Sequence, residues 1–528
     1  MTVTAVQEPD LPRTRKPYPV VDVFAGPGGL GEGFASLTGE DDGPRFQDAV
    51  AIERDEFSHR TLLLRHFLRC FPKGGLPDEY YRYLNGDITA DDLFRAHKVE
   101  FAEAGRSALR ISLGPESHAG VRKIINNRLA GKKRWALVGG PPCQAYSLVG
   151  RSRMMGRPDF EQDERHFLYL EYLKIIADHA PPVFVMENVK GLLSAQVGGA
   201  SVIDRILTDL AHPGGALKGA RNGLSYRLYS LTEQEMPGDR VDPRLFLVRA
   251  EDFGVPQARH RMFIVGIRSD INVRPGLLRP HKAPTVSETI GNLPAIRSGL
   301  SRGADSVERW SKEIDRLSTM DIARQLNGAS YCKAVASGIV LELSSSDDSP
   351  SCRISRSYPG RIPGRFKVLS SLHDARLRTL TGHESRGHMG SDLRRYMYAA
   401  VFARVTGRSP KLSDFPRSLL PAHQNVELGT SGKMFSDRFR VQLPDDVSTT
   451  ITSHISKDGH YFIHYDPAQC RSLTVREAAR LQTFPDNYHF EGPRTAQYHQ
   501  VGNAVPPYLA RQIAAVVADV LDAIKGEP

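Results

Sequence analysis

Short apolar runs alternate with helical patterns over the first half of the chain. Apolar runs typical of buried strands cover residues 19–24, 48–53, 135–138, 183–186 and 261–266. Apolar residues recur at helical spacing over 55–71 and 167–180, and a polar turn at 85–89 ends a further predicted strand-and-turn unit. Strands that alternate with helices predict an α/β fold with a doubly wound, Rossmann-like parallel sheet.

The pattern changes after about residue 267. Periodicity weakens over 268–469, where runs such as 344–350 and 358–365 are typical of loops, and helical spacing returns over 473–482 and 505–524. We therefore expect four segments. These are a flexible leader (1–18), an α/β catalytic domain (19–267), a smaller irregular domain (268–469) and a C-terminal segment that returns to the catalytic domain (470–528).

Reactive side chains follow the predicted strands. Active groups of a doubly wound sheet gather at the carboxyl ends of its strands. One site is therefore expected from the residues at or just beyond those ends, which are Asp22, Glu53, Asp87, Cys143 and Glu187.

Composition narrows the class of protein. Of 528 residues, 40% are hydrophobic and 25% charged, and no apolar stretch resembles a membrane span or a signal peptide, so we expect a cytoplasmic protein with no membrane partner. The net charge of +10 fits either nucleic-acid binding or ordinary solubility. Five scattered cysteines without a C-x-x-C pair argue against a metal site and leave a thiol for chemistry.

One cysteine has a distinctive setting. Gly139-Gly140-Pro141-Pro142 leads from a strand into Cys143, and the prolines stiffen the backbone that holds the thiol. The alternative, a buried structural cysteine, needs no such rigid approach. The glycine-rich segment 22–33 is less specific, because an NAD or FAD site would use a similar turn.

Charged residues flank two other strands. Glu187 ends an apolar run, where partial desolvation would raise its pKa and let it carry a proton near neutral pH; a helix cap or an ion pair is the alternative. Arg259 and Arg261, two positions apart, share one face of an incoming strand and would position an acceptor-rich base. A surface charge pair is the alternative for them.

These blocks together resemble the DNA cytosine-5 methyltransferases of bacteria, in the family's order and from about residue 20 to 514. The matching blocks are Asp22-Val23-Phe24-Ala25-Gly26, Glu53, Gly86-Asp87-Ile88-Thr89, Pro141-Pro142-Cys143-Gln144, Glu187-Asn188-Val189, Gln257-Ala258-Arg259-His260-Arg261, 476–485 and 500–507. Pro27 and Ala145-Tyr146 depart from the usual pattern without removing a reactive group, and insertions are expected near 95–130 and 211–242.

The resemblance implies a sequence-specific transfer of a methyl group from S-adenosylmethionine to C5 of a cytosine flipped out of duplex DNA. Cys143 would attack C6, Glu187 would protonate N3, Arg261 would hold O2, and Arg259 would orient Glu187 and the base. The implied cofactor residues are Phe24, Ala25, Gly26, Gly28, Gly29, Glu53, Asp87, Ile88, Pro141, Asn503 and Ala504. The implied DNA contacts are Gln144, Ser147, Arg151, Arg153 and Thr450.

The resemblance also makes residues 268–469 a target-recognition domain. There Arg394-Arg395-Tyr396 and 437–440 would be either DNA readers or structural ion pairs. We expect a monomer on double-stranded DNA and an association with a restriction-modification or phage-defence system. The alternatives are an RNA cytosine methyltransferase, an inactive DNA-binding homologue, and a Rossmann oxidoreductase that leaves Pro-Pro-Cys-Gln unexplained.

Overall fold

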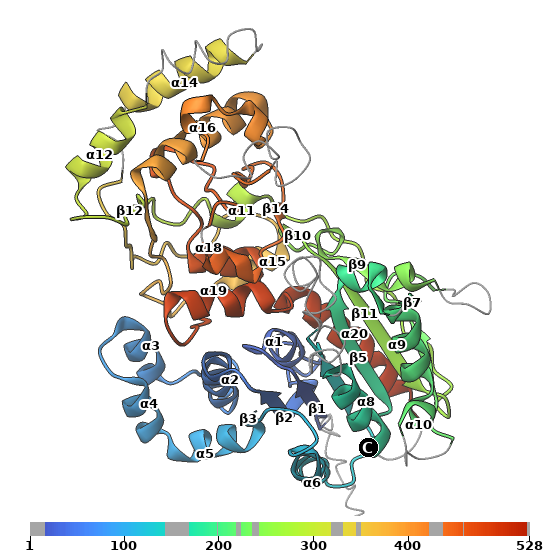
Figure 1. The fold of residues 1–528 in the computed structure, drawn as a ribbon. Coiled ribbons are helices and arrows are strands. Elements are labelled where there is room, and N and C mark those ends of the chain that lie inside the picture. The colour runs from blue at the N-terminus through green and yellow to red at the C-terminus, as the bar shows by residue number, and fades with distance from the viewer. Residues whose placement is uncertain are drawn as a thin grey trace, which may run out of the picture.

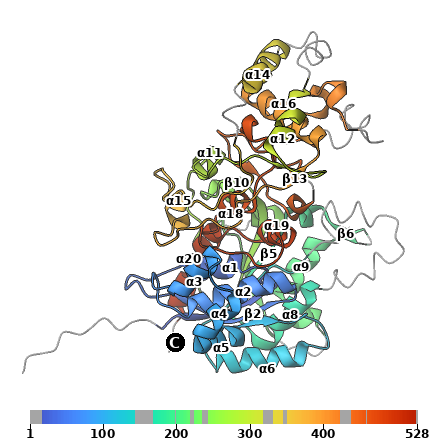
Figure 2. The same ribbon diagram turned by 90° about the vertical axis from the view of Figure 1, so that its left-hand side faces the viewer.

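The chain forms a sheet-containing part and a mainly helical part. The computed structural model describes residues 16–142, 168–197, 199–217, 223–234, 242–317, 331–344, 350–421, 437–457 and 459–524. Figure 1 shows the sheet and its helices in the lower part, with α12, α14 and α16 in the upper part. The α18 and α19 helices lie between the two parts (Figures 1 and 2).

The main sheet has the order β3-β2-β1-β4-β5-β11-β8, with β9 paired to β11. The pairs from β3 to β5 are parallel, whereas β11 is antiparallel to its neighbours. The α/β class is confirmed, with an antiparallel strand added at one side. The strands are β1 (Tyr18–Val23), β2 (Phe46–Glu53), β3 (Ala108–Arg110), β4 (Ala136–Gly139), β5 (Val183–Val189), β8 (Tyr226–Tyr229), β9 (Leu247–Arg249) and β11 (His260–Arg268).

Helices cover both faces of this sheet, which explains why its central strands are mostly apolar. One face packs against α1 (Gly29–Ala35) and α20 (Pro507–Ala523). The other face packs against α6 (His118–Leu129), α8 (Leu168–His179) and α9 (Val202–Ala211). The chain reverses direction across the sheet between β1 and β4, and such a switch point is where doubly wound sheets bind ligands.

The Gly86-Asp87 turn differs from its prediction. It does not close a strand, because it joins α3 (Asp78–Asn85) to α4 (Ala90–Ala96). Gly86 ends α3 in the left-handed conformation with φ 84°, a helix end that glycine favours. Since glycine and aspartate mark helix ends as well as strand ends, the sequence pattern could not separate the two. The third strand of the sheet is β3, beyond α5 (Lys98–Ser107).

The expected irregular domain is more helical than predicted. Its helices are α11 (Val286–Ile290), α12 (Val307–Asp315), α14 (Cys332–Ser344), α15 (Lys367–Leu372) and α16 (Gly390–Thr406). The α16 helix is buried over most of its length in the core of this part, so it lacks the amphipathic stripe by which a surface helix is recognised. The loop expected over 358–365 contains no helix or strand.

The C-terminal segment is divided between the two parts. The α18 (Val475–Leu481) and α19 (Arg494–Asn503) helices share a core with residues such as Val286 and Ile451, and only α20 joins the core of the main sheet. The α19 helix also contacts the catalytic part, because it packs against α2 (Glu56–Arg69) and the Thr61 hydroxyl donates to the Gln500 side chain at 2.6 Å.

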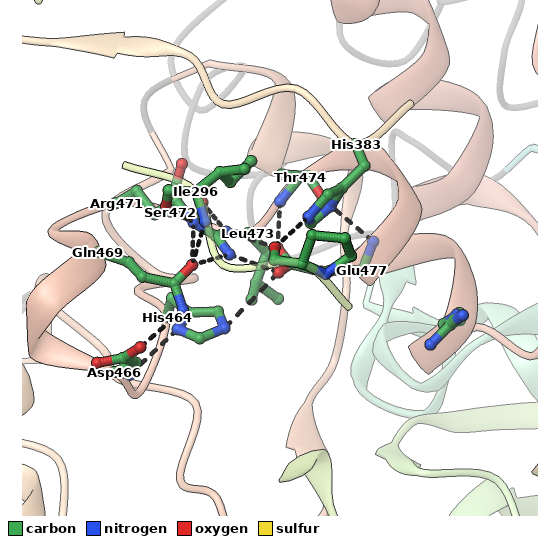
Figure 3. A network of polar contacts seen from close by, with 12 residues as sticks. Ile296, His383, His464, Asp466, Gln469, Arg471, Ser472, Leu473, Thr474 and Glu477 are labelled. Atoms are coloured by element: carbon green, nitrogen blue, oxygen red, sulfur yellow. Dashed lines mark hydrogen bonds and ion pairs between the residues drawn. The ribbon is translucent and has the colours of Figure 1, made fainter. Parts of the chain in front are cut away.

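A buried polar network explains this division. Arg471 forms a two-point ion pair with Glu477 (2.7 Å to each oxygen) and donates to the Ile296 carbonyl at 2.9 Å (Figure 3). His383 contacts the Thr474 hydroxyl at 3.1 Å. A buried charge pair of this kind needs all its partners in place, so the start of α18 stays with the helical part.

One helical stretch in the described chain, residues 494–523, reaches the length and apolarity of a membrane span. Its apolar window is 72% buried inside the protein. The α20 helix supplies most of this burial by packing on the main sheet, so the folded core accounts for the apolar character of the stretch.

Candidate active site

The glycine-rich loop between β1 and α1 crosses the switch point. Phe24, Gly26 and Gly28 all have positive φ values of 58°, 59° and 95°. This conformation is ordinary for glycine and uncommon for phenylalanine, so Phe24 is held under backbone strain. A Cβ built on Gly26 meets no atom within 4 Å, and this side of the loop therefore faces open space.

Glu53 fixes this loop from the end of β2. One of its carboxylate oxygens accepts the Gly26 N–H at 2.8 Å, and the other accepts the N–H groups of Arg54 and Asp55 at 2.9 and 2.7 Å. The Ala25 N–H donates to the Ile52 carbonyl at 3.0 Å. Phe24 and Glu53 thus lie at neighbouring strand ends and are both half-buried, as a cofactor site there requires.

The C-terminal block closes the other side of the loop. A Cβ on Gly29 would lie 2.4 Å from the Val505 carbonyl oxygen and 3.2 Å from the Ala504 Cβ. Gly29 therefore permits a close backbone contact rather than facing the open side of the loop. Asn503, at the end of α19, is exposed next to this contact.

Asp87 and Ile88 lie elsewhere. The α2 helix (Glu56–Arg69) packs one face on the sheet through Leu62 and another on α3 and α4 through Leu64 and Phe67. Asp87, beyond α3, is therefore separated from the glycine loop by α2; it is exposed and accepts only a weak 3.4 Å hydrogen bond from Asn85 among the described residues. Ile88 packs against the cluster outside α2.

Glu187 and Arg261 form an ion pair across β5 and β11. The Arg261 Nε lies 3.2 Å from the Glu187 Oε1, and both side chains are mostly buried at 16% and 13% exposure. Burial raises the pKa of Glu187 above its ordinary value, although Arg261 and Arg259 oppose the shift. The predicted direction of this pKa shift is confirmed, and the carboxyl group is suited to carry a proton.

The turn leading to Cys143 is built around Glu187. A Cβ on Gly140 would lie 2.8 Å from the Glu187 Oε2, so only glycine leaves room for the carboxylate. The Asn188 amide donates to the Pro141 carbonyl at 3.3 Å and so ties the turn to β5. Cys143, which follows Pro142 directly, lies outside the described residues, as do Gln144, Ser147, Arg151 and Arg153.

Arg259 bonds to backbone carbonyls of segments far away in the sequence. Its side chain is buried and donates to the carbonyl oxygens of Ile451 (2.9 Å) and Gly502 (3.2 Å). Arg261 makes the ion pair with Glu187, whereas Arg259 precedes β11 and lies outside the strand. Arg259 instead joins the strand end to the helical part and to α19.

The Thr450 segment lies beside this arginine. A two-residue strand β14 (Ser448–Thr449) pairs with β10 (Gln257–Ala258), and the Thr450 hydroxyl donates to the Ala258 carbonyl at 2.5 Å. The hydroxyl implied to touch a DNA phosphate is thus bonded to the backbone in this structure, at the junction of the two parts.

Two buried glutamines strengthen the junction, and the sequence had marked them only as parts of longer blocks. Gln257 donates to the Gln482 side chain at 2.7 Å and accepts the Ile451 N–H at 2.9 Å. Gln482 in turn donates to the carbonyl oxygens of Val501 and Ala504 at 2.8 and 3.0 Å. The sequence signal that could have identified these two glutamines was an uncharged polar side chain directly after an apolar run.

Three arginines of the clusters in the helical part form ion pairs. Arg394 pairs with Glu313 at 3.0 Å, and Arg395 pairs with Asp392 at 2.7 Å. Arg440 pairs with Asp437. Ion pairs within the helical part thus involve Arg394, Arg395 and Arg440, and a role of these clusters in reading DNA stays a prediction.

The topology and the site define a class. A switch-point sheet with a glycine loop at β1, a carboxylate at the end of β2 and a buried Glu–Arg pair at β5 describes an α/β methyltransferase. The chain belongs to the family of C-5 cytosine-specific DNA methylases, whose profile matches residues 116–518. The resemblance drawn from the motifs is thereby confirmed, and so is the class of enzyme, a DNA (cytosine-5-)-methyltransferase.

Relatives extend over most of the chain. It is 32% identical over 526 residues to the type II methyltransferase M.Bpa9945I of Bacillus paralicheniformis, covering 95% of this chain and 99% of the relative. It is 28% identical to the DNA (cytosine-5-)-methyltransferase M.ApeKI of Aeropyrum pernix, covering 76% and 85%. Among solved structures, the methyltransferase EhMeth of Entamoeba histolytica aligns with a TM-score of 0.43 at 12% identity, covering 96% and 99%.

Proposed function

We propose that this enzyme transfers a methyl group from S-adenosylmethionine to C5 of a cytosine flipped out of duplex DNA, through a transient bond between the Cys143 Sγ and C6. The observation that carries this proposal is the buried Glu187–Arg261 pair at the switch-point edge, directly beneath the turn that leads to Cys143. A target inside a stacked duplex could not reach this edge, so the base must leave the helix.

The residues at the loop fit S-adenosylmethionine. Gly26 borders open space, Phe24 offers a half-buried aromatic ring, and Glu53 offers carboxylate oxygens for hydroxyl groups. When bound, the cofactor supplies an electrophilic methyl group on a sulfonium. S-adenosylmethionine carries no phosphate, so the loop need not bind one.

The side chains divide the chemistry between them. The Cys143 thiolate adds to C6 while protonated Glu187 gives its proton to N3, so the electron pair released from the ring collects at C5 and no net charge builds on the base. C5 then takes the methyl group, with S-adenosylhomocysteine as the leaving group. Loss of the C5 proton to solvent, return of the N3 proton to Glu187 and expulsion of the thiolate restore the ring. Arg261 holds Glu187 and lies where it can contact O2, and Arg259 positions the strand that carries Arg261.

The proposed biological role follows from the names of the relatives. M.Bpa9945I is named a type II methyltransferase and aligns over nearly the full length of both chains, so we propose a restriction-modification role for this chain as well. The enzyme would modify a specific duplex sequence as a monomer in the cytoplasm and protect host DNA from a matching nuclease. The helical part, residues 268–469, would read the target, with Thr450 at its border with the catalytic site.

The test measures transfer of labelled methyl groups to duplex DNA and to transfer RNA, and maps the product by bisulfite sequencing. We expect 5-methylcytosine in one duplex sequence, none in transfer RNA, and covalent trapping on duplexes with 5-fluorocytosine at the target. Cys143→Ala should abolish both signals, whereas Cys352→Ala, at an exposed cysteine, should keep them. Methylation by the folded Cys143→Ala variant would contradict the covalent mechanism.

A further inference from the structure

Exposed cationic side chains from three segments surround Tyr508, near the start of α20. A Cβ built on Gly254 would lie 3.3 Å from the His281 Cβ and 3.3 Å from the Tyr508 ring, so residues 279–282 reach Tyr508. Tyr508 also packs against the buried cluster that residues within 362–372 form. We call the exposed arginines and lysines of this region the basic surface, which consists of Arg279, Lys282, Arg361, Arg365, Lys367 and Arg511.

The basic surface has no ion pair within the part of the chain that the structure describes. Its neighbour Arg353 differs, because it pairs with Glu384 at 3.1 Å. Asp252 lies beside the basic surface, since its carbonyl accepts the His281 N–H at 2.9 Å, but its carboxylate is 3.6 Å from Arg249. The positive charge of the basic surface is therefore available to an external anion.

The backbone beneath the basic surface is held in place. The Asp486 N–H donates to the Leu372 carbonyl at 2.8 Å, which fixes the end of α15. The Gln512 side chain donates to the Phe253 carbonyl at 2.9 Å and ties α20 to the segment beside His281. Cations on a fixed backbone lose less conformational freedom on binding than cations on a mobile loop. They suit a ligand that presents several anionic groups at fixed spacing, as the DNA backbone does.

The basic surface and the candidate active site lie on different sides of the protein. Figure 2 shows α15 and α20 on the left, and on the right β6 (Gln196–Val197), which follows the strand that carries Glu187. The persistence length of DNA is about 150 base pairs, so a duplex of about 20 base pairs at the active site cannot bend round to the basic surface. A second duplex segment can reach it.

We propose that the basic surface binds the phosphate backbone of a second duplex segment while a first segment occupies the active site. The arginines and lysines contact phosphate oxygens and release condensed counterions, and no base is read. An enzyme that holds two segments of a long DNA can pass from one to the other without entering bulk solvent, which shortens the search for target sites. This inference goes beyond the proposed methyl transfer.

Titration with a cytosine-free duplex tests this assignment. The enzyme is trapped on a duplex of about 20 base pairs that carries 5-fluorocytosine at the target, and the complex is purified away from free duplex. A fluorescent duplex of about 30 A·T base pairs is added at about 50 mM salt, and its anisotropy gives the Kd. We expect the trapped complex to bind this second duplex, and no binding would overturn the proposal. Failure to form the trapped complex would count against the proposed function, and the variants below would then be compared as free enzymes.

A triple variant tests the residues themselves. Arg361→Gln, Arg365→Gln and Lys367→Gln together change only exposed side chains, so the variant should stay folded, as thermal unfolding verifies. We expect the Kd for the A·T duplex to rise about 10-fold. The slope of log Kobs against log salt should fall in magnitude by up to about 2.7, because each lost phosphate contact removes about 0.9. Methyl transfer to the short target duplex should stay within about twofold of the parent rate, since that duplex does not reach the basic surface.

A matched control removes the same charge elsewhere. Lys123→Gln, Lys132→Gln and Lys133→Gln lie on or just after α6 and before β4, at the amino ends of the strands (Figure 1). This control should keep the Kd for the A·T duplex within about twofold. Equal losses in both triple variants, or a loss in neither, would overturn the proposal. Binding of poly(glutamate) in preference to the duplex would assign the basic surface to an acidic protein and overturn it as well.

Discussion

Gly140→Ala tests how tightly the catalytic carboxylate is packed. The backbone of Gly140 is not in the left-handed region, so alanine is conformationally permitted. Its Cβ would lie 2.8 Å from the Glu187 Oε2, whereas ordinary contacts begin at 3.4 Å. The carboxylate must therefore move, by about 0.6 Å if an ordinary contact is to be reached, the difference between these two distances.

Such a shift disturbs the 3.2 Å contact between Glu187 and Arg261. Because a misplacement of about 1 Å can cost about 100-fold in rate, we expect kcat to fall about 10- to 100-fold. Overpacking at one site lowers the free energy of unfolding by about 1–3 kcal/mol, so the protein should remain folded. The loss would then reflect geometry and not unfolding.

The assay is the initial rate of methyl transfer to duplex DNA at saturating cofactor, alongside urea unfolding. Gly105→Ala is the matched control, since its Cβ meets nothing within 4 Å on the exposed side of α5. That control should keep full activity and gain stability of about 0.5–1 kcal/mol, as glycine-to-alanine changes in helices do. If Gly140→Ala keeps a rate within twofold of the parent, the packing argument fails.

Three further predictions concern stability. Arg480→Met leaves the fully buried Asp486 without its ion-pair partner and should lower the free energy of unfolding by about 3–5 kcal/mol in urea titrations, whereas Met at an exposed arginine should not. Gly33→Ala brings a Cβ to 2.3 Å from the Ala510 Cβ, so calorimetric melting should show a loss of about 1–3 kcal/mol; an unchanged Tm would contradict the close α1–α20 contact. Burial lowers the pKa of His66 to about 4. Because only the unfolded chain binds a proton at this ring between pH 6.5 and pH 4, the free energy of unfolding is highest above pH 6.5 and falls as the pH drops toward 4. At pH 5 the free energy of unfolding should be lower by about 2 kcal/mol, and His66→Gln should remove this loss.

Local patterns predicted much of this protein. The strands β1, β2, β4, β5 and β11 lie where apolar runs were found, because a strand buried on both faces needs an uninterrupted apolar run. The raised pKa of Glu187 also followed from its place at a strand end. The α16 helix was missed for the opposite reason, since a helix buried all round has no polar face.

Long-range contacts decided the rest. Arg259 was expected to orient Glu187 and the base, and the structure adds bonds from its guanidinium to the carbonyls of Ile451 and Gly502, which lie 192 and 243 positions away in the sequence. The spacing of Arg259 and Arg261 holds no information about which carbonyls will lie opposite each arginine. The same applies to Gln257 and Gln482 at the junction.

By itself, the sequence determined the family and the type of sheet and proposed the reactive side chains, because these depend on residue types in a fixed order along the chain. Only the tertiary structure decided which of those side chains share a site. Glu53 and Glu187 reach the switch-point edge because their strands end there, whereas Asp87 follows a helix on the far side of α2. Neighbours at a strand end are set by how strands pair and helices pack, and that information is spread over the whole chain.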